Sequence, residues 1–230
     1  RKRYLNNKIA SYKSEIPIIV VGNLTIGGTG KTPLVKYIVT ELKNRGYRPG
    51  IVSRGYGGKF KETLKVSTDT SVKETGDEAQ ILAKLDVPFY IDKNRVRAVK
   101  KLTKNHECDV IISDDGLQHY KMGRHIEIAV IDGKRRFGNN LTFPAGPLRE
   151  ASKRINTVDF IVNNSGPTNE DEYLMNISPT KFVHLKSGKS YSIENWPMHK
   201  QVHAVAGLGN PGRFFDLLDK LGFDIIRHPF

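Results

Sequence analysis

The sequence predicts an α/β protein with a mostly parallel sheet, helices on both faces of that sheet, and a smaller C-terminal α/β part. Short apolar runs alternate with amphipathic stretches of helical spacing, which is the pattern of strands and helices in a parallel sheet. Hydrophobic residues make up 38% of the 230 residues and charged residues 27%, the balance of a folded globular protein. No apolar run reaches the roughly 18–20 residues that a membrane span needs.

The elements of the first part follow from these patterns in order along the chain. Strands are predicted where the runs are apolar, at residues 16–22, 50–53, 87–91, 109–113, 126–132 and 158–163. Helices are predicted where apolar residues recur at helical spacing, at residues 31–45, 77–85 and 95–102. Residues 55–69 are rich in Gly and Lys and predict a loop or hairpin, and residues 133–149 predict an irregular segment.

The character of the sequence changes after about residue 165. Residues 165–179 are polar with two prolines, which predicts a linker or surface excursion. Beyond it, strands are expected at residues 182–185, 201–206 and 224–227, and a helix at residues 214–221. We therefore expect a core of residues 1–165 and a smaller C-terminal part of residues 166–230.

The charge and cysteine content restrict the partners and the compartment. Lys and Arg number 37 against 24 Asp and Glu, so the formal net charge is +13, which suits a polyanion such as nucleic acid, an anionic membrane or a phosphorylated substrate. The basic residues are spread along the chain without a recognition motif, so no nucleic-acid partner is expected. The single cysteine, Cys108, cannot form an internal disulfide, as is typical of a reducing compartment. The chain begins at Arg1 and ends without a stop signal, so we expect truncation at both ends.

A glycine-rich loop at residues 25–32 (TIGGTGKT) is the strongest functional signal. It follows an apolar strand and opens a helix, as a phosphate-binding loop does, whereas a chance glycine turn before Lys-Thr would not need that context. The expected ATP-binding residues are Thr25, Ile26, Gly27, Gly28, Thr29, Gly30, Lys31 and Thr32. Lys31 would reach the β- and γ-phosphates as a catalytic residue, and the Thr32 hydroxyl would bind Mg²⁺. The loop departs from the usual pattern because Thr25 occupies the position of the first glycine.

Two carboxylates complete the predicted nucleotide site. Asp114 and Asp115 follow the apolar strand of residues 109–113, so they lie at its C-terminal edge. Ligands of open α/β sheets bind at that edge, and a phosphate loop needs a nearby carboxylate for its metal ion. The fold is therefore predicted to be like that of phosphate-loop NTPases, with Thr32, Asp114 and Asp115 as the Mg²⁺ residues.

Six segments, which include the glycine-rich loop and the two aspartates, resemble in order and spacing those of a known family. They are VGNLTIGGTGKTP at 21–33, SRGYGG at 53–58, GDEA at 76–79, DDGLQH at 114–119, IDGKRRFG at 131–138 and PAGPLRE at 144–150. The chain is similar over nearly its whole length to the tetraacyldisaccharide 4′-kinases, the lipid A kinases of Gram-negative bacteria. AVAGLGNPGRFF at 204–215 is similar to the C-terminal part of that family.

The resemblance implies a kinase that transfers the γ-phosphate of ATP to the 4′-hydroxyl of a lipid-linked disaccharide 1-phosphate. The family works at the cytoplasmic face of the inner membrane, as a peripheral protein or through an N-terminal apolar helix that is missing here. Residues 1–13 would follow that helix, and their basic side chains would lie near anionic lipid, unless they are an ordinary solvated segment.

The resemblance also implies roles for three residues outside the loop. Asp77 matches the family's catalytic aspartate, which activates the sugar hydroxyl together with a histidine, although from the residues alone a helix cap is the alternative. Arg95 and Arg149 match active-site arginines, whose guanidinium groups suit phosphoryl oxygens. The family's partner histidine belongs to an Asp-His motif absent from this chain, and neither His119 nor His228 is assigned to that role.

The sequence leaves two alternative functions, and it contains one motif that could be mistaken for a dinucleotide-binding site. A phosphate-loop kinase or NTPase acting on another small phosphorylated substrate is the alternative enzyme, and a nucleic-acid-binding module is the alternative of a different class. Residues 207–212 (GLGNPG) satisfy a dinucleotide-binding pattern. The proline within this stretch removes an N–H donor, so we interpret it as a strand-to-helix turn.

Overall fold

The structure is a computed structural model that describes residues 10–207 and 211–230. Most of the basic N-terminal segment and residues 208–210 of the GLGNPG stretch lie outside the described residues. The chain divides into two compact units, Arg1–Met175 and Asn176–Phe230.

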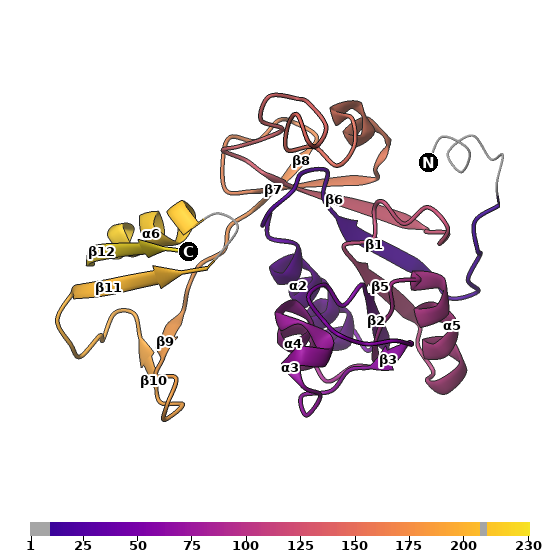
Figure 1. The fold of residues 1–230 in the computed structure, drawn as a ribbon, viewed down its shortest axis with the longest axis horizontal. Helices are drawn as coiled ribbons and strands as arrows, with labels where there is room; N and C mark the ends of the chain where they lie inside the picture. Colours follow the sequence, from indigo (N-terminus) through magenta and orange to yellow (C-terminus); the bar gives the residue numbers. More distant parts are fainter. Residues whose placement is uncertain (1–9, 208–210) are drawn as a thin grey trace. The chain divides into compact units, whose positions relative to one another are not determined.

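The first unit is built on an eight-stranded sheet with the order β3-β4-β2-β5-β1-β6-β7-β8 (Figure 1). Its strands are β1 (Ile18–Gly22), β2 (Pro49–Ser53), β3 (Leu64–Lys65), β4 (Phe89–Ile91), β5 (Val110–Asp114), β6 (Ile126–Asp132), β7 (Phe160–Asn164) and β8 (Glu172–Met175). Every pairing in this sheet is parallel except that of β3 with β4. The prediction of a mostly parallel sheet is confirmed.

Helices cover both faces of this sheet, as predicted. The helices are α2 (Lys31–Asn44), α3 (Val72–Thr75), α4 (Asp77–Ala83) and α5 (Arg95–Asn105), followed by the 3-10 helix η1 (Ser152–Thr157). One hydrophobic cluster joins Val99 and Leu102 of α5 to the sheet, and a second joins Leu34 of α2 and Leu82 of α4 to it. In Figure 1, α5 lies on the opposite side of the strands from α2 and α4. Because the central strands are covered on both sides, their residues are apolar in continuous runs.

The C-terminal ends of β1, β2 and β5 meet at one edge of the sheet. The pairing register sets Val21 of β1 beside Asp114 of β5, and Val52 of β2 beside Ser113. The glycine-rich loop therefore leaves the sheet next to the strand that ends in the two aspartates, as expected for ligand sites of parallel sheets.

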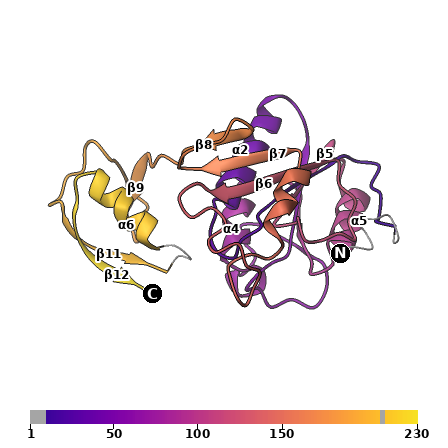
Figure 2. The ribbon, with the colours of Figure 1, turned by 90° about the horizontal axis from the view of Figure 1, so that it is seen from above.

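One sequence prediction is corrected at the end of this unit. Residues 165–179 were expected to be a linker, but within them β8 pairs in parallel with β7 and extends the sheet (Figure 2). The carboxylate of Glu172 receives two hydrogen bonds from Arg136, at 2.8 and 2.6 Å, which tie this strand to the segment after β6. The first unit consequently ends at Met175, later than the boundary expected near residue 165.

The second unit contains two small sheets and one helix. Strands β9 (Lys181–Val183) and β10 (Ser190–Ser192) form an antiparallel pair, and β11 (Gln201–Ala206) and β12 (Asp224–Pro229) form a parallel pair joined through α6 (Pro211–Lys220). Phe215 and Leu218 of α6 are buried with Phe223, and Phe182 and Trp196 pack against this core. Among the described residues, none of the helices has the length and apolar character required to cross a bilayer.

Candidate active site

The glycine-rich loop presents its backbone amides without internal acceptors. In the described part of the chain, the N–H groups of Gly27, Gly28, Thr29 and Gly30 donate no hydrogen bond. Gly30 is the N-cap of α2, has a left-handed φ of 96°, and provides no side-chain cap. Consecutive free amides next to a helix N-terminus are the arrangement that binds phosphate oxygens.

The structure explains why Thr25 can replace the first glycine of the usual pattern. Thr25 forms a backbone bridge with Leu148 and is 4% exposed, so it belongs to the extended entry of the loop. The next amide, that of Ile26, donates to the carbonyl of Pro147 at 2.7 Å. The left-handed conformations occur later, at Gly27 and Gly30. A β-branched residue therefore fits at position 25 without backbone strain.

Asp115 is the centre on which the predicted cations converge. The Lys31 Nζ atom lies 3.7 Å from its Oδ1 atom. Arg149 donates to both of its carboxylate oxygens at 2.8 Å. Arg95 donates to its backbone carbonyl at 3.3 Å. Three of the four residues predicted to be catalytic are thus brought together, although they come from three separate segments.

The two adjacent aspartates have opposite electrostatic environments. Burial raises the pKa of Asp114 to about 6, and the neighbouring charge of Asp115 adds to this effect. Burial also acts to raise the pKa of Asp115, but Lys31 and Arg149 outweigh it and hold that pKa below its usual range. The left-handed φ of 49° at Asp115 marks the end of the strand, so the two side chains do not follow strand alternation.

The oxygen atoms of Asp114 fit a divalent cation. The side chain is 2% exposed, and its Oδ2 atom accepts a hydrogen bond from Ser53 at 3.2 Å. Among the described residues, its buried Oδ1 atom has no hydrogen-bond partner. Mg²⁺ is commonly held by one or two carboxylates together with phosphate oxygens and water, so this donor set matches that ion.

Arg95 is buried at the start of α5. It is 3% exposed, and it donates to the carbonyl of Asp92 at 3.1 Å. Burial lowers its pKa to about 10, so the guanidinium stays charged at neutral pH. Its Nε atom has no partner within the described ranges. The residue therefore retains hydrogen-bonding capacity towards an anion.

Asp77 occupies a different kind of position from these paired residues. It is exposed, and no other described side chain or backbone group forms a hydrogen bond or ion pair with its carboxylate. It is the first residue of α4, whose N-cap is Gly76, so its side chain does not act as the cap.

The backbone before Asp77 is held by close packing of glycines. A Cβ atom at Gly76 would lie 2.0 Å from the carbonyl oxygen of Tyr56, and one at Gly58 would lie 2.3 Å from that of Glu74. Side chains cannot fit at such distances, so the turn after Arg54 packs directly on the junction of α3 and α4. This contact explains why glycine stands at both positions.

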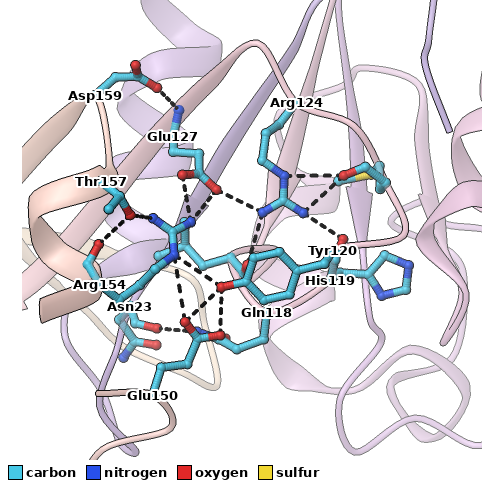
Figure 3. Close-up of polar contacts among 12 residues, drawn as sticks. Asn23, Gln118, His119, Tyr120, Arg124, Glu127, Glu150, Arg154, Thr157 and Asp159 are labelled. Carbon is cyan, nitrogen blue, oxygen red and sulfur yellow. Dashed lines mark hydrogen bonds and ion pairs between the residues drawn. The ribbon is translucent and has the colours of Figure 1, made fainter. Parts of the chain in front are cut away.

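A network of charged groups supports the turn after Asp115 (Figure 3). Arg124 donates to the carbonyls of Leu117 and His119 at 3.0 and 2.6 Å and to Glu127 at 2.8 Å. Gln118 donates to the carbonyl of Asn23 at 3.0 Å, which joins this turn to the start of the phosphate loop.

The same network reaches the segment that carries Arg149. Arg154 donates to both oxygens of Glu127, at 2.5 and 2.6 Å, and to the Tyr120 hydroxyl at 3.1 Å. Tyr120 in turn donates to the carboxylate of Glu150 (Figure 3). Sequence reasoning missed this network, although an acidic residue inside the apolar run IEIAVID was a signal that Glu127 needs a buried partner.

Comparison with known proteins identifies the family. A sequence model described as tetraacyldisaccharide-1-P 4′-kinase matches residues 1–230. The chain belongs to this family. The assignment confirms the resemblance and the expectation of an ATP- and Mg²⁺-dependent lipid A kinase.

Individual members of the family agree with this assignment. The chain is 45% identical over 226 residues to a tetraacyldisaccharide 4′-kinase of Shewanella denitrificans, covering 98% of this chain and 68% of the relative. It is 49% identical over 220 residues to one of Coxiella burnetii, covering 95% and 64%. It also matches a crystal structure of LpxK from Aquifex aeolicus in complex with ATP, with a TM-score of 0.81, 30% identity, and coverage of 100% and 75%. The chain thus spans about two thirds of the length of its curated relatives.

Proposed function

We propose that the protein transfers the γ-phosphoryl group of ATP to the 4′-hydroxyl of a tetraacyldisaccharide 1-phosphate at the edge of the sheet that carries residues 25–32. The observation that supports this most strongly is the convergence of Lys31, Arg149 and Arg95 on Asp115, together with four loop amides that have no acceptor among the described residues. In the reaction, the bond between the γ-phosphorus and its bridging oxygen breaks, and the acceptor's 4′-oxygen bonds to that phosphorus. ADP leaves, and the hydroxyl proton passes to a base.

The donor side would act by positioning and charge. The loop amides bind phosphate oxygens, and Lys31 and Arg149 offset the negative charge that the transferring group carries. Thr32, Asp114 and Asp115 would hold Mg²⁺, which would offset part of the negative charge of the phosphate groups. Asp115 would keep Lys31 and Arg149 oriented towards the same group, because both cations already contact its carboxylate.

The acceptor side would use Asp77 as the base. Its exposed carboxylate is free to accept the proton of a sugar hydroxyl, which a carboxylate already held in an ion pair could not do as easily. Asp77 would need to lie within hydrogen-bond reach of the hydroxyl when the acceptor is bound.

An anionic acceptor fits the surface next to the Asp115 turn. A groove of about 590 Å³ there is lined by Lys93, Arg97 and Lys121, with Glu150 as its single acidic residue. The basic side chains suit the 1-phosphate of the acceptor and the anionic cytoplasmic face of the inner membrane, with which the protein would associate.

The test is phosphorylation of the lipid with [γ-³²P]ATP and Mg²⁺. We expect label in the tetraacyldisaccharide, separated by chromatography, and at least a hundredfold less label with Lys31→Ala. A soluble disaccharide phosphate without acyl chains is the second acceptor. Labelling of that compound but not of the lipid would favour the rival kinase of small phosphorylated substrates.

A further inference from the structure

The directions of the loop carbonyls determine where the loop amides point. In a planar trans peptide, the carbonyl of one residue and the N–H of the next point in opposite directions. A group that binds a loop carbonyl from outside therefore turns the following amide towards the inside of the loop. The orientation of the phosphate-binding amides can thus be set by residues that never touch the nucleotide.

Asn164, the last residue of β7, binds one of these carbonyls. Its Nδ2 atom donates to the carbonyl of Thr29 at 2.9 Å, across 135 positions in the sequence. Asn164 is 1% exposed. The hydroxyl of Ser165 donates to its Oδ1 atom at 3.2 Å, which fixes the side-chain amide with its nitrogen towards the loop.

The conformation of Gly30 depends on the same contact. A Cβ atom on Gly30 would lie 2.3 Å from the Asn164 Nδ2 atom and 3.0 Å from the Met175 Cε atom. The loop therefore packs directly against β7 and β8, with no room for a side chain at this position. The positive φ of Gly30 and the Asn164 contact together hold the peptide between Thr29 and Gly30 in one orientation.

Two other carbonyls of the loop are held in the same manner. Arg135 donates to the carbonyl of Ile26 at 3.0 Å, and Asn23 donates to that of Gly27 at 3.4 Å. Each contact turns the next amide, that of Gly27 or Gly28, away from the donor. Three of the four amides without acceptors thus follow a carbonyl that is held by a side chain outside the turn.

We propose that Asn164 is a positioning residue of the kinase, which presents the Gly30 amide to a phosphate oxygen of ATP by holding the Thr29 carbonyl. The inference rests on the proposed binding of the triphosphate at residues 25–32. A hydrogen bond to a charged group is among the stronger ones in proteins, so misorientation of this amide should weaken ATP binding by roughly ten- to a hundredfold.

The test compares neighbouring asparagines of β7. Asn164→Ala removes the donor, and Asn164→Asp also places an acceptor against the Thr29 carbonyl. Asn163→Ala is the matched control, because Asn163 is equally buried and donates instead to Pro167 and Glu172. Affinity for ATP and for AMP, which lacks the β- and γ-phosphates, is measured by competition with a fluorescent ATP analogue, and folding by thermal melting.

We expect both Asn164 variants to lose ATP affinity about tenfold or more, Asn164→Asp the most, with little change for AMP. Asn163→Ala should keep the ATP affinity of the native protein even where its melting temperature falls. If the Asn164 variants do not fold, Ser165→Ala tests the same contact, because the freed amide can rotate, and a two- to fivefold loss of ATP affinity is expected.

Unchanged ATP affinity in a folded Asn164 variant, or in Ser165→Ala where that variant is needed, would overturn the inference. An equal loss for AMP, or an equal loss in Asn163→Ala, would overturn it as well. Lys31→Ala separates this failure from a failure of the proposed function. If Lys31→Ala loses ATP affinity while the Asn164 variants keep it, only the role of Asn164 is refuted. If all of these variants keep the ATP affinity of the native protein, the placement of the triphosphate at residues 25–32 is refuted.

Discussion

The donor and acceptor sides of the proposed reaction site differ in how their side chains are held. On the donor side, Lys31 and Arg149 contact the carboxylate of Asp115. On the acceptor side, Asp77 is exposed and has no partner among the described residues. Groups that stabilise a highly charged triphosphate act best when they are already fixed in place, whereas a base must keep an open lone pair for its substrate.

The largest expected effect tests the acceptor side. Asp77→Ala should lower kcat by roughly 10²–10⁴-fold with ATP affinity near that of the native protein, because only proton transfer is lost. Asp77→Asn is the control, since it keeps the size of the side chain but not its basicity. Single-turnover kinetics and equilibrium ATP binding give the two values. Recovery of kcat in Asp77→Asn would show that the residue has a structural role.

Lys31→Ala tests the donor side, where the charged groups are already held in place. Removing the ammonium should slow phosphoryl transfer about a hundredfold or more, because several kcal/mol of charge stabilisation are lost at the β- and γ-phosphates. In contrast to Asp77→Ala, this change should also weaken ATP binding. Steady-state kinetics at varied ATP concentration make the distinction, and a Lys31→Ala protein with native kcat and KM for ATP would contradict the assignment of the loop.

Much of the donor side could be predicted from sequence because its signals are local. The glycines, Lys31 and Thr32 form one continuous motif, and Asp114 and Asp115 follow one apolar strand. Parallel strands end at a common edge, so the proximity of these two segments followed from the fold class alone. Arg95 and Arg149 were identified only through the family resemblance, since single arginines carry no local pattern.

The parts that sequence analysis missed depend on long-range contacts. β8 is a four-residue edge strand stabilised by Arg136, and its short apolar run YLM lies within a polar, proline-containing segment that indicates a linker. The contact of Asn164 with Thr29 depends on the packing of β7 beside the loop, which no spacing rule contains. Asp77 is not the N-cap because α4 begins at Asp77 itself and Gly76 is the cap, a difference of one residue that sequence patterns do not resolve.

The two carboxylates at the end of β5 allow a sharper test of the donor side. Asp114→Asn and Asp115→Asn should each raise the Mg²⁺ concentration for half-maximal activity about tenfold or more, because each removes an anionic oxygen ligand. Asp115→Asn should also raise KM for ATP, since Lys31 and Arg149 lose the group that orients them. Mg²⁺ titrations with native midpoints in both variants would exclude this edge as the metal site.

His119, in the turn after Asp115, gives a smaller, pH-dependent effect on stability. Burial, with the nearby charge of Arg95, lowers its pKa to about 4, so the folded protein keeps the ring neutral. Between pH 6.5 and 4 the unfolded chain binds a proton that the folded one does not, so stability falls as the pH falls. His119→Asn should reduce this loss by a few degrees of melting temperature. Melting curves at pH 7 and pH 5 measure the difference, and an unchanged pH dependence would contradict the neutral buried ring.

The smallest expected effect comes from Tyr120→Phe, which tests whether the network behind the donor side only supports it. The change removes the hydroxyl that donates to Glu150 and accepts from Arg154, but leaves the contacts of Arg154 with Glu127 in place. The loss of such hydrogen bonds should cost about 1–2 kcal/mol of unfolding free energy. Because neither Lys31 nor Arg149 contacts the hydroxyl, kcat should change less than about threefold. Denaturant unfolding measures the loss of stability, and steady-state kinetics measure kcat. A kcat loss as large as that of Lys31→Ala would show that Tyr120 acts on the reacting groups and does not only support the residues that do.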